Sequence, residues 1–175
     1  AGGTLDGVTV NGDLDLTTNN ASVTVLNGLT LNGTAWLGNA AGSTHGQLYF
    51  HGTQTLGGTG TVVFGKSGDN WLRTYNATSN DPNDVVLTIG SGITVRGRAG
   101  AIVKSEYGRE GTIINQGTIA ADTTGKTFLG GPFIGRKPGA VRGDIGIHGQ
   151  NLHVLQGHTQ LFGRDHGEEG LGASS

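Results

Sequence analysis

Apolar and polar residues alternate with a period of two along much of the chain. Clear examples are Val8-Thr9-Val10, Leu29-Thr30-Leu31 and Ile93-Thr94-Val95. In an extended strand, such a triplet places two apolar side chains on one face and a small polar one on the other. Glycine, which destabilises a helix interior by about 1 kcal/mol, recurs every few residues. The pattern therefore predicts many short, half-buried β-strands and almost no helix.

A second, longer period lies over this alternation. The hexapeptide Gly-apolar-Thr-apolar-x-Gly occupies residues 7–12, 28–33 and 92–97, and looser versions start at Gly52 and Gly111. These segments recur at about 20 residues or at twice that spacing, which is typical of repeat architectures. A propeller blade needs about twice this length. The repeat predicts an all-β fold, a single-stranded parallel β-helix (β-solenoid) with about 20 residues per coil and glycine at its corners.

The repeats do not cover the chain evenly. They are regular over residues 1–127, except for the polar stretch 66–84, which contains the turn signal Asp81-Pro82 and is predicted to be an exposed loop. Residues 128–163 keep short alternations and are predicted to continue or to end the solenoid. Residues 164–175 are predicted to be a polar C-terminal tail.

Composition narrows the function classes. Of 175 residues, 35 are glycine and none is cysteine, which excludes disulfides, thiolate nucleophiles and Cys-ligated zinc. The formal net charge is −2, with 11 Lys and Arg residues, so a nucleic-acid partner is not expected. The longest apolar runs are far shorter than the ~18 residues of a membrane helix, so membrane insertion is not expected either.

Several segments resemble the repeats of a known class of proteins. The runs GVTVNGDLDLT, GLTLNGTAWLG, TQTLGGTGTVVFG, LTIGSGITVRG and GTIINQGTIAAD are similar to repeats of large bacterial secreted or surface proteins of the filamentous-haemagglutinin and autotransporter-passenger type. The resemblance covers residues 4–125. It implies a right-handed parallel β-helix and a secreted or cell-surface location in bacteria. It carries no catalytic signature.

The histidines do not predict a metal centre. His148, His153 and His158 are spaced by five residues, and His166 follows. A shift of five on a strand changes the face, so successive members do not converge as metal ligands must. Asp69 to Asp84 lack the Asp-x-Asp-x-Asp-Gly spacing of a calcium loop. We predict surface histidines and no cofactor.

Carbohydrate chemistry is the alternative that stays open. Asp13 and Asp15 are two apart on one strand and share a face, as the paired acids of polysaccharide-cleaving β-helices do. The polar loop supplies the candidate glycan contacts, because an aromatic ring can stack on a sugar and a carboxylate can accept its hydroxyls. These contacts are Trp71, Tyr75, Asp81 and Asp84.

The ends of a solenoid suggest the partner. Unpaired N–H and C=O groups on an end coil are a template for further strand pairing, and residues 3–7 enter the repeat without an amphipathic cap. We therefore expect self-association through open solenoid ends. The function predicted is a non-enzymatic structural or adhesive module of an extracellular assembly, a head-to-tail stacking unit of a fibre. The alternative is a carbohydrate-binding or carbohydrate-cleaving β-helix.

Overall fold

The regular secondary structure of the described residues consists of β-strands. The computed structural model describes residues 2–75, 85–103, 111–121, 128–130, 133–135, 141–142 and 153–154. Within these ranges the strands are joined by turns and bends, and the pairings between strands are parallel. The all-β class and the parallel arrangement predicted from the sequence are confirmed.

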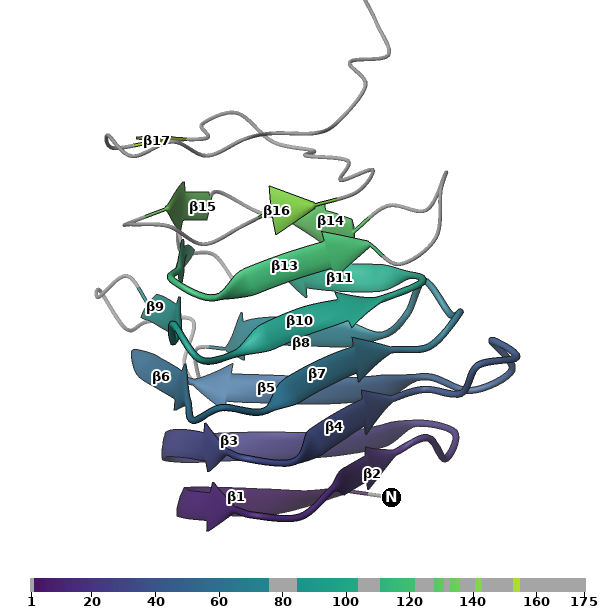
Figure 1. The fold of residues 1–175 in the computed structure, drawn as a ribbon. Helices are drawn as coiled ribbons and strands as arrows, with labels where there is room; N and C mark the ends of the chain where they lie inside the picture. Colours follow the sequence, from purple (N-terminus) through teal and green to yellow (C-terminus); the bar gives the residue numbers. More distant parts are fainter. Residues whose placement is uncertain are drawn as a thin grey trace, which may run out of the picture.

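The strands form three ladders, which we number in the order in which the chain enters them (Figure 1). The first contains β1 (Gly2–Val10), β3 (Ala21–Leu31), β5 (Gly46–His51), β8 (Trp71–Tyr75), β11 (Gly100–Val103) and β14 (Phe128–Gly130). The second continues from β1 and β3 into β6 (Gln54–Gly57), β9 (Val85–Ile89), β12 (Gly111–Asn115), β15 (Phe133–Gly135) and β17 (His153–Val154). The third contains β2 (Leu14–Leu16), β4 (Thr34–Leu37), β7 (Thr61–Phe64), β10 (Thr94–Gly97), β13 (Thr118–Ala121) and β16 (Val141–Arg142).

The first two ladders join into one sheet because β3 belongs to both. Its first half pairs with β5 and its second half with β6. Between the halves the chain bends at Asn27 and Gly28, whose φ angles are 55° and 88°. Positive φ is tolerated by glycine and by asparagine better than by other residues. The Asn-Gly pair therefore marks the corner between the first and second ladders.

The sequence separation between paired positions varies along the first ladder. Gly2 pairs with Ser22, which is the separation that the sequence period predicts. The separation is larger where Gln47 pairs with Trp71, and larger again where Trp71 pairs with Ala101. The strands do not lengthen along this ladder, so the extra residues lie in the connections between them. The period read from the sequence thus describes the pairing of β1 with β3 and underestimates the separation in the middle of the chain. It applies again where Ile113 of β12 pairs with Phe133 of β15.

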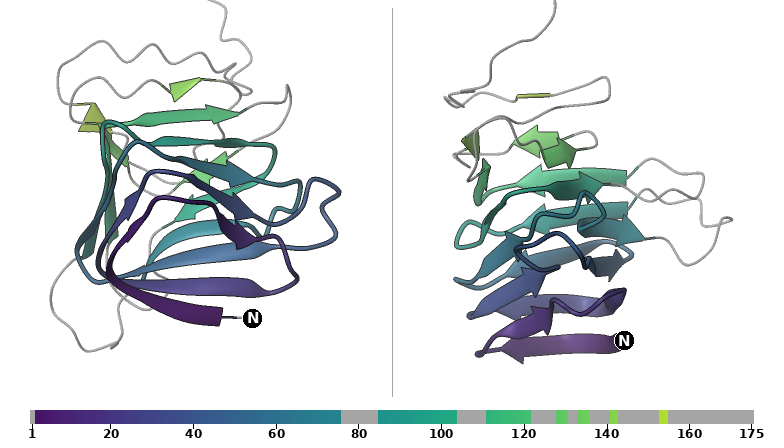
Figure 2. Two further views of the ribbon diagram at one scale, coloured as in Figure 1. Left: turned by 60° about the horizontal axis from the view of Figure 1, so that its bottom comes forward. Right: turned by 90° about the vertical axis from the view of Figure 1, so that its right-hand side faces the viewer.

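The interior is filled by columns of aliphatic and aromatic side chains, one from each successive strand of a ladder, and Figure 2 shows the three ladders around this common interior. Inward residues alternate with outward ones: in β9, Val85, Leu87 and Ile89 are buried, whereas the two residues between them are half-buried. Fully burying one such side chain stabilises the fold by about 1.5–3 kcal/mol. The in-register inward columns are Val23–Leu48–Leu72–Ile102, Leu29–Leu56–Ile89 and Ala35–Val62–Val95–Ile119.

Buried amide side chains close the corners between ladders. The Asn70 Oδ1 accepts the Gly46 N–H at 3.0 Å, and its Nδ2 donates to Ser67 O at 2.8 Å and to Ala99 O at 3.2 Å. Gln54 acts in the same way, donating to Val25 O at 2.8 Å and accepting the Gly28 N–H. A buried backbone group without a partner is costly. These amides therefore supply partners where the chain leaves a strand.

The predicted exposed loop at 66–84 is wrong for its central part. Residues 71–75 form β8, and Leu72 and Thr74 are fully buried. Asn70, immediately before the strand, is fully buried as well. The sequence did not show this strand because a polar Thr74 occupies an inward position and a cation, Arg73, precedes it. Residues 76–84 lie outside the described residues.

Candidate functional site

A cluster of aromatic and polar side chains lies on the outer face of the first ladder. It is formed by β5 and β8, where Gln47 pairs with Trp71 and Tyr49 pairs with Arg73. Alternation directs these four side chains outward, because Leu48 and Leu72 between them are fully buried. We call Gln47, Tyr49, Trp71 and Arg73 the aromatic platform.

Arg73 holds the platform together. Its guanidinium carbon lies 4.9 Å from the centroid of the Trp71 ring and 5.2 Å from that of Tyr49, both within cation–π range. Arg73 is only 4% exposed, although it occupies an outward position. The Tyr49 hydroxyl also donates to the Gln47 Oε1. Each ring is therefore fixed by a neighbour, while Gln47, Tyr49 and Trp71 stay half-buried.

The candidate glycan contacts are only partly brought together. Trp71 is a member of the platform, and Tyr75 ends β8 opposite His51 in the register. Asp81 and Asp84 lie outside the described residues. The sequence analysis missed Tyr49 and Gln47, although the run Gln47-Leu48-Tyr49-Phe50 has the alternation of a strand. The pairing of that strand with residues 71–75 was the missing information.

The paired acids Asp13 and Asp15 interact with their own backbone surroundings. Asp13 Oδ1 accepts the Thr34 N–H at 2.9 Å, and its Oδ2 accepts Trp36 Nε1 at 3.4 Å. Asp15 accepts a hydrogen bond from the Thr17 hydroxyl and another from the Thr17 N–H at 2.9 Å, which lower the pKa of Asp15 below its ordinary value of 3.8. Asp13 thus links the start of β2 to β4, and Asp15 holds the chain where it leaves β2.

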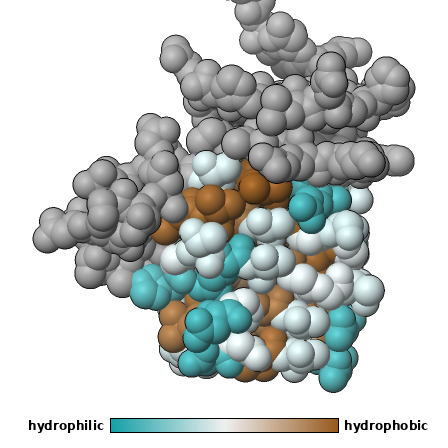
Figure 3. Space-filling view, turned by 90° about the vertical axis from the view of Figure 1, so that its left-hand side faces the viewer, coloured by the Kyte–Doolittle hydropathy of each residue, from teal (hydrophilic) through white to brown (hydrophobic). Residues whose placement is uncertain are grey.

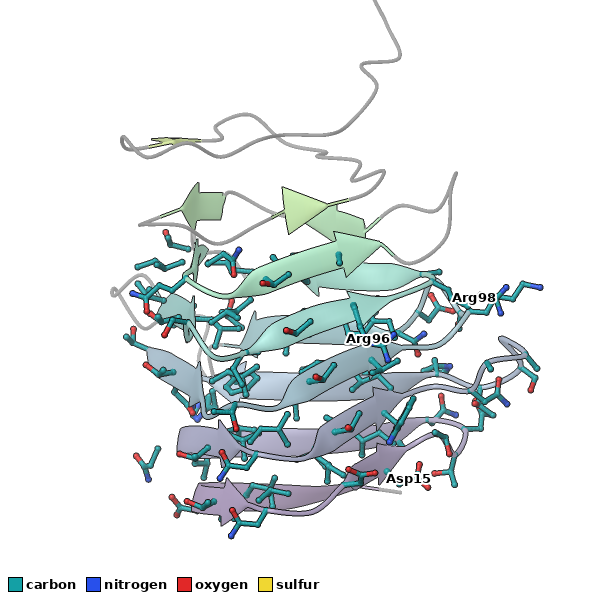
Figure 4. All side chains as sticks on the ribbon, viewed as in Figure 1. Asp15, Arg96 and Arg98 are labelled. Atoms are coloured by element: carbon teal, nitrogen blue, oxygen red, sulfur yellow. The ribbon has the colours of Figure 1, made fainter. Side chains whose placement is uncertain are left out.

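The third ladder does not bring Arg96 close to Asp15. Figure 4 shows Asp15 and Arg96 on this ladder and Arg98 at the corner beside it. Asp15, Trp36, Val63 and Arg96 occupy one outward column on successive strands. Three strand spacings separate Asp15 from Arg96, about 14 Å. The described residues therefore do not pair these acids with a cation as a polysaccharide-cleaving site would.

The third ladder carries a column of threonines that the sequence analysis did not predict. Four half-buried threonines stack in register on its outer side: Thr34, Thr61, Thr94 and Thr118. Stacked β-branched side chains stabilise neighbouring strands. The adjacent column is irregular, with the 39% exposed Trp36 next to Val63. The column is therefore explained by sheet stability.

The outer face of the second ladder is mixed. Figure 3 shows it as hydrophilic, intermediate and hydrophobic patches lying side by side. Thr30 and Thr55 are exposed there. No group of three or more His, Asp or Glu residues that could hold a metal ion occurs in the part of the chain that the structure describes. His153 falls in β17, and His148, His158 and His166 lie outside the described residues.

The fold and the platform together define an all-β protein with parallel ladders and an aromatic cluster on one face. No protein family, curated protein or solved structure matches this chain. Over the described ranges, no helix is long and apolar enough to cross a bilayer.

Proposed function

We propose that the chain is a parallel β-solenoid that serves as a non-enzymatic structural and adhesive module of an extracellular or bacterial cell-surface assembly. One observation carries this proposal: each strand of a ladder stacks in register on the strand of the next circuit. Thr61 on Thr94, for example, repeats the pairing of Thr34 on Thr61. Stacked circuits form a stiff body with long flat faces, which suits structural and adhesive roles.

The side chains support a structural role. The largest fully buried ones are Phe, Leu and Ile, and the polar groups Asn70 and Gln54 bind backbone atoms at the corners. Asp13, the first of the paired acids, accepts a backbone N–H in the same way. In this proposal, these amide and carboxylate side chains stabilise the backbone rather than act on a substrate.

Paired cysteines test the solenoid, because the chain has no cysteine of its own. Outward residues that pair in register are close enough for a disulfide, whose Cα atoms lie about 4.4–6.8 Å apart. We expect rapid intramolecular oxidation of one double-cysteine variant for each ladder: S22C/Q47C, T55C/T88C and T61C/T94C. The control T61C/R96C is displaced by two residues, which puts its Cα atoms about 8 Å apart, and is expected to stay reduced. Equal oxidation of control and test pairs would contradict the stacking.

The first circuit suggests how copies associate. In the described ranges β1 pairs along one edge, with β3, and along its other edge with no strand; Leu5 and Val10 of β1 are only half-buried. A second copy that paired there would make a heterologous contact, which does not close and builds a fibre. This part of the proposal predicts filaments in negative-stain electron microscopy at high concentration.

Two variants of β1 separate end-to-end association from other contacts. Leu5→Lys places a charge beside the core on β1, whereas Thr9→Lys places the same charge on an exposed outward position of that strand. We expect Leu5→Lys to abolish filaments and Thr9→Lys to leave them. A protein that sediments as a monomer at high concentration would overturn self-association and leave the solenoid itself to the cysteine test.

A further inference from the structure

We propose that the aromatic platform is a binding site for a neutral oligosaccharide, which stacks a pyranose ring on Trp71 and Tyr49. This inference deepens the adhesive part of the proposed function and rests on it. The site then lies on the outer face of the strand pair β5 and β8, of which only β8 belongs to the 66–84 segment.

The rings of Trp71 and Tyr49 are held in place by neighbouring side chains. A ring that is fixed before binding loses little conformational entropy when a ligand arrives. Arg73 contacts both Trp71 and Tyr49, and the Tyr49 hydroxyl is held by Gln47. The rings nevertheless stay half-buried, so part of each remains available to a ligand. An aromatic ring that is fixed and partly exposed is suited to contact the C–H face of a sugar.

The neighbouring side chains indicate uncharged hydrogen bonding. In the preceding strand, Ser22 lies opposite Gln47 and Thr24 lies opposite Tyr49, and both are half-buried. The strand next to the platform therefore offers small hydroxyl groups that can form hydrogen bonds with a sugar. The strand spacing of about 4.8 Å is close to the width of a pyranose ring. Consecutive sugars of a chain lying across the strands would therefore meet consecutive strands.

The charge of the platform argues against nucleic acids and acidic glycans as ligands. A nucleic acid or an acidic glycan needs several exposed cations. The only cation of the platform, Arg73, is 4% exposed, and residues 1–65 contain no Lys or Arg. A protein partner would want a larger apolar patch than two rings among hydroxyl side chains. A neutral polyhydroxylated ligand matches the platform best.

Isothermal titration calorimetry tests the site, because it measures binding without relying on Trp71 as a reporter, and the chain has a second tryptophan, Trp36, on another ladder. The probes are cellohexaose, chitohexaose and β-1,4-galactohexaose at millimolar concentrations. We expect at least one probe to bind the wild type and Trp71→Ala to weaken that binding at least about tenfold, since a stacked ring is lost. Tyr49→Ala weakens it similarly. Trp36→Ala, the matched control on the third ladder, keeps wild-type affinity.

Two further variants separate binding from folding. Trp71→Phe keeps a ring and is expected to retain more affinity than Trp71→Ala at an unchanged melting temperature. Arg73→Met removes the positioning cation and is expected to weaken binding while the register-directed T61C/T94C disulfide still forms.

The proposal is overturned if no neutral probe binds, if Trp36→Ala rather than Trp71→Ala loses binding, or if the wild type binds only heparin or polygalacturonate in a salt-sensitive manner. Because the cysteine pairs report on the fold without any sugar, a failure of binding alone leaves the proposed solenoid standing. Failure of the cysteine pairs would remove the proposed function itself.

Discussion

Asn70 is the residue whose replacement tests the corner architecture most directly. Its side chain is fully buried and joins three parts of the chain: Gly46 at the start of β5, Ser67 in the turn that precedes β8, and Ala99 one circuit later. Asn70→Ala removes the acceptor of the Gly46 N–H and the donor to both carbonyls. The side chain has no exposed surface, so bulk solvent does not reach these groups in the folded protein.

The expected loss follows from these three bonds. A buried donor left without its acceptor costs about 1–3 kcal/mol, and each neutral bond lost contributes about 0.5–1.5 kcal/mol, so we expect a loss of about 3 kcal/mol in the free energy of unfolding. For a chain of this length that loss lowers the melting temperature by about 6–12 °C. Urea unfolding followed by circular dichroism and by tryptophan fluorescence measures it, and coincident transitions justify a two-state treatment.

Two companions sharpen the test. Asn32 is exposed, and its side chain bonds to Asn11 at 2.9 Å and to the Thr59 N–H at 3.3 Å, so Asn32→Ala should cost less than about 1 kcal/mol because water replaces those partners. Asn70→Asp keeps the acceptor and turns a carboxylate toward two carbonyls, which raises the pKa of the new acid. Its deficit should therefore shrink as the pH falls. If the stability of Asn70→Ala matches that of the wild type, or its loss is no greater than that of Asn32→Ala, the corner argument is refuted.

The other predictions concern alternation, corners and pH. Val62 is fully buried, whereas Val63 on the same strand is half-buried. Val62→Thr should therefore lower the free energy of unfolding by about 1–2 kcal/mol and Val63→Thr should hardly change it, as measured by differential scanning calorimetry. Equal effects of the two substitutions would mean that the inward assignment is wrong. Gly52 (φ 80°) has open space around it, whereas Gly58 (φ 101°) lies against Leu31 O. In urea unfolding, Gly52→Ala should lower the free energy of unfolding by about 1 kcal/mol, and Gly58→Ala should lower it clearly more. The reverse order would contradict the close approach of Gly58 to the Leu31 carbonyl. The Asp15 carboxylate has a folded-state pKa below 3.8, so its stabilising effect is present above pH 3.8 and lost as the pH falls through the folded value. Melting temperatures of wild type and Asp15→Asn should therefore converge in acid, and a difference that stays constant from neutral to acid pH would exclude this origin.

Local sequence was sufficient for the all-β class and for strands other than β8. The period-two triplets Val23-Thr24-Val25 and Leu87-Thr88-Ile89 lie in β3 and β9 with their apolar residues buried, as the alternation predicts. Glycine marks corners where φ is positive, Gly28 and Gly52 among them. Both signals act within a few residues, so they can be read without knowing what the strand packs against.

The strand β8 shows where local reasoning fails. Its alternation contains one aliphatic residue, Leu72, and a buried threonine, and it follows the buried Asn70, so the segment has the composition of a loop. Only the neighbouring strand explains these residues. Phe50 packs in register beside Thr74, and Tyr49 beside Arg73, so polar side chains are tolerated in positions that an isolated strand would fill with apolar ones.

The sequence by itself determined that this chain forms short strands with glycine corners and parallel pairing. Tertiary structure alone decided which residues meet, and with that the aromatic platform. Trp71 and Gln47 are neighbours only because the connection between β5 and β8 has the length that brings them into register. Strand alternation depends on the local backbone, whereas register depends on connection lengths that vary from circuit to circuit. For that reason a periodic sequence can specify the strands of a protein while leaving its surface sites to the folded chain.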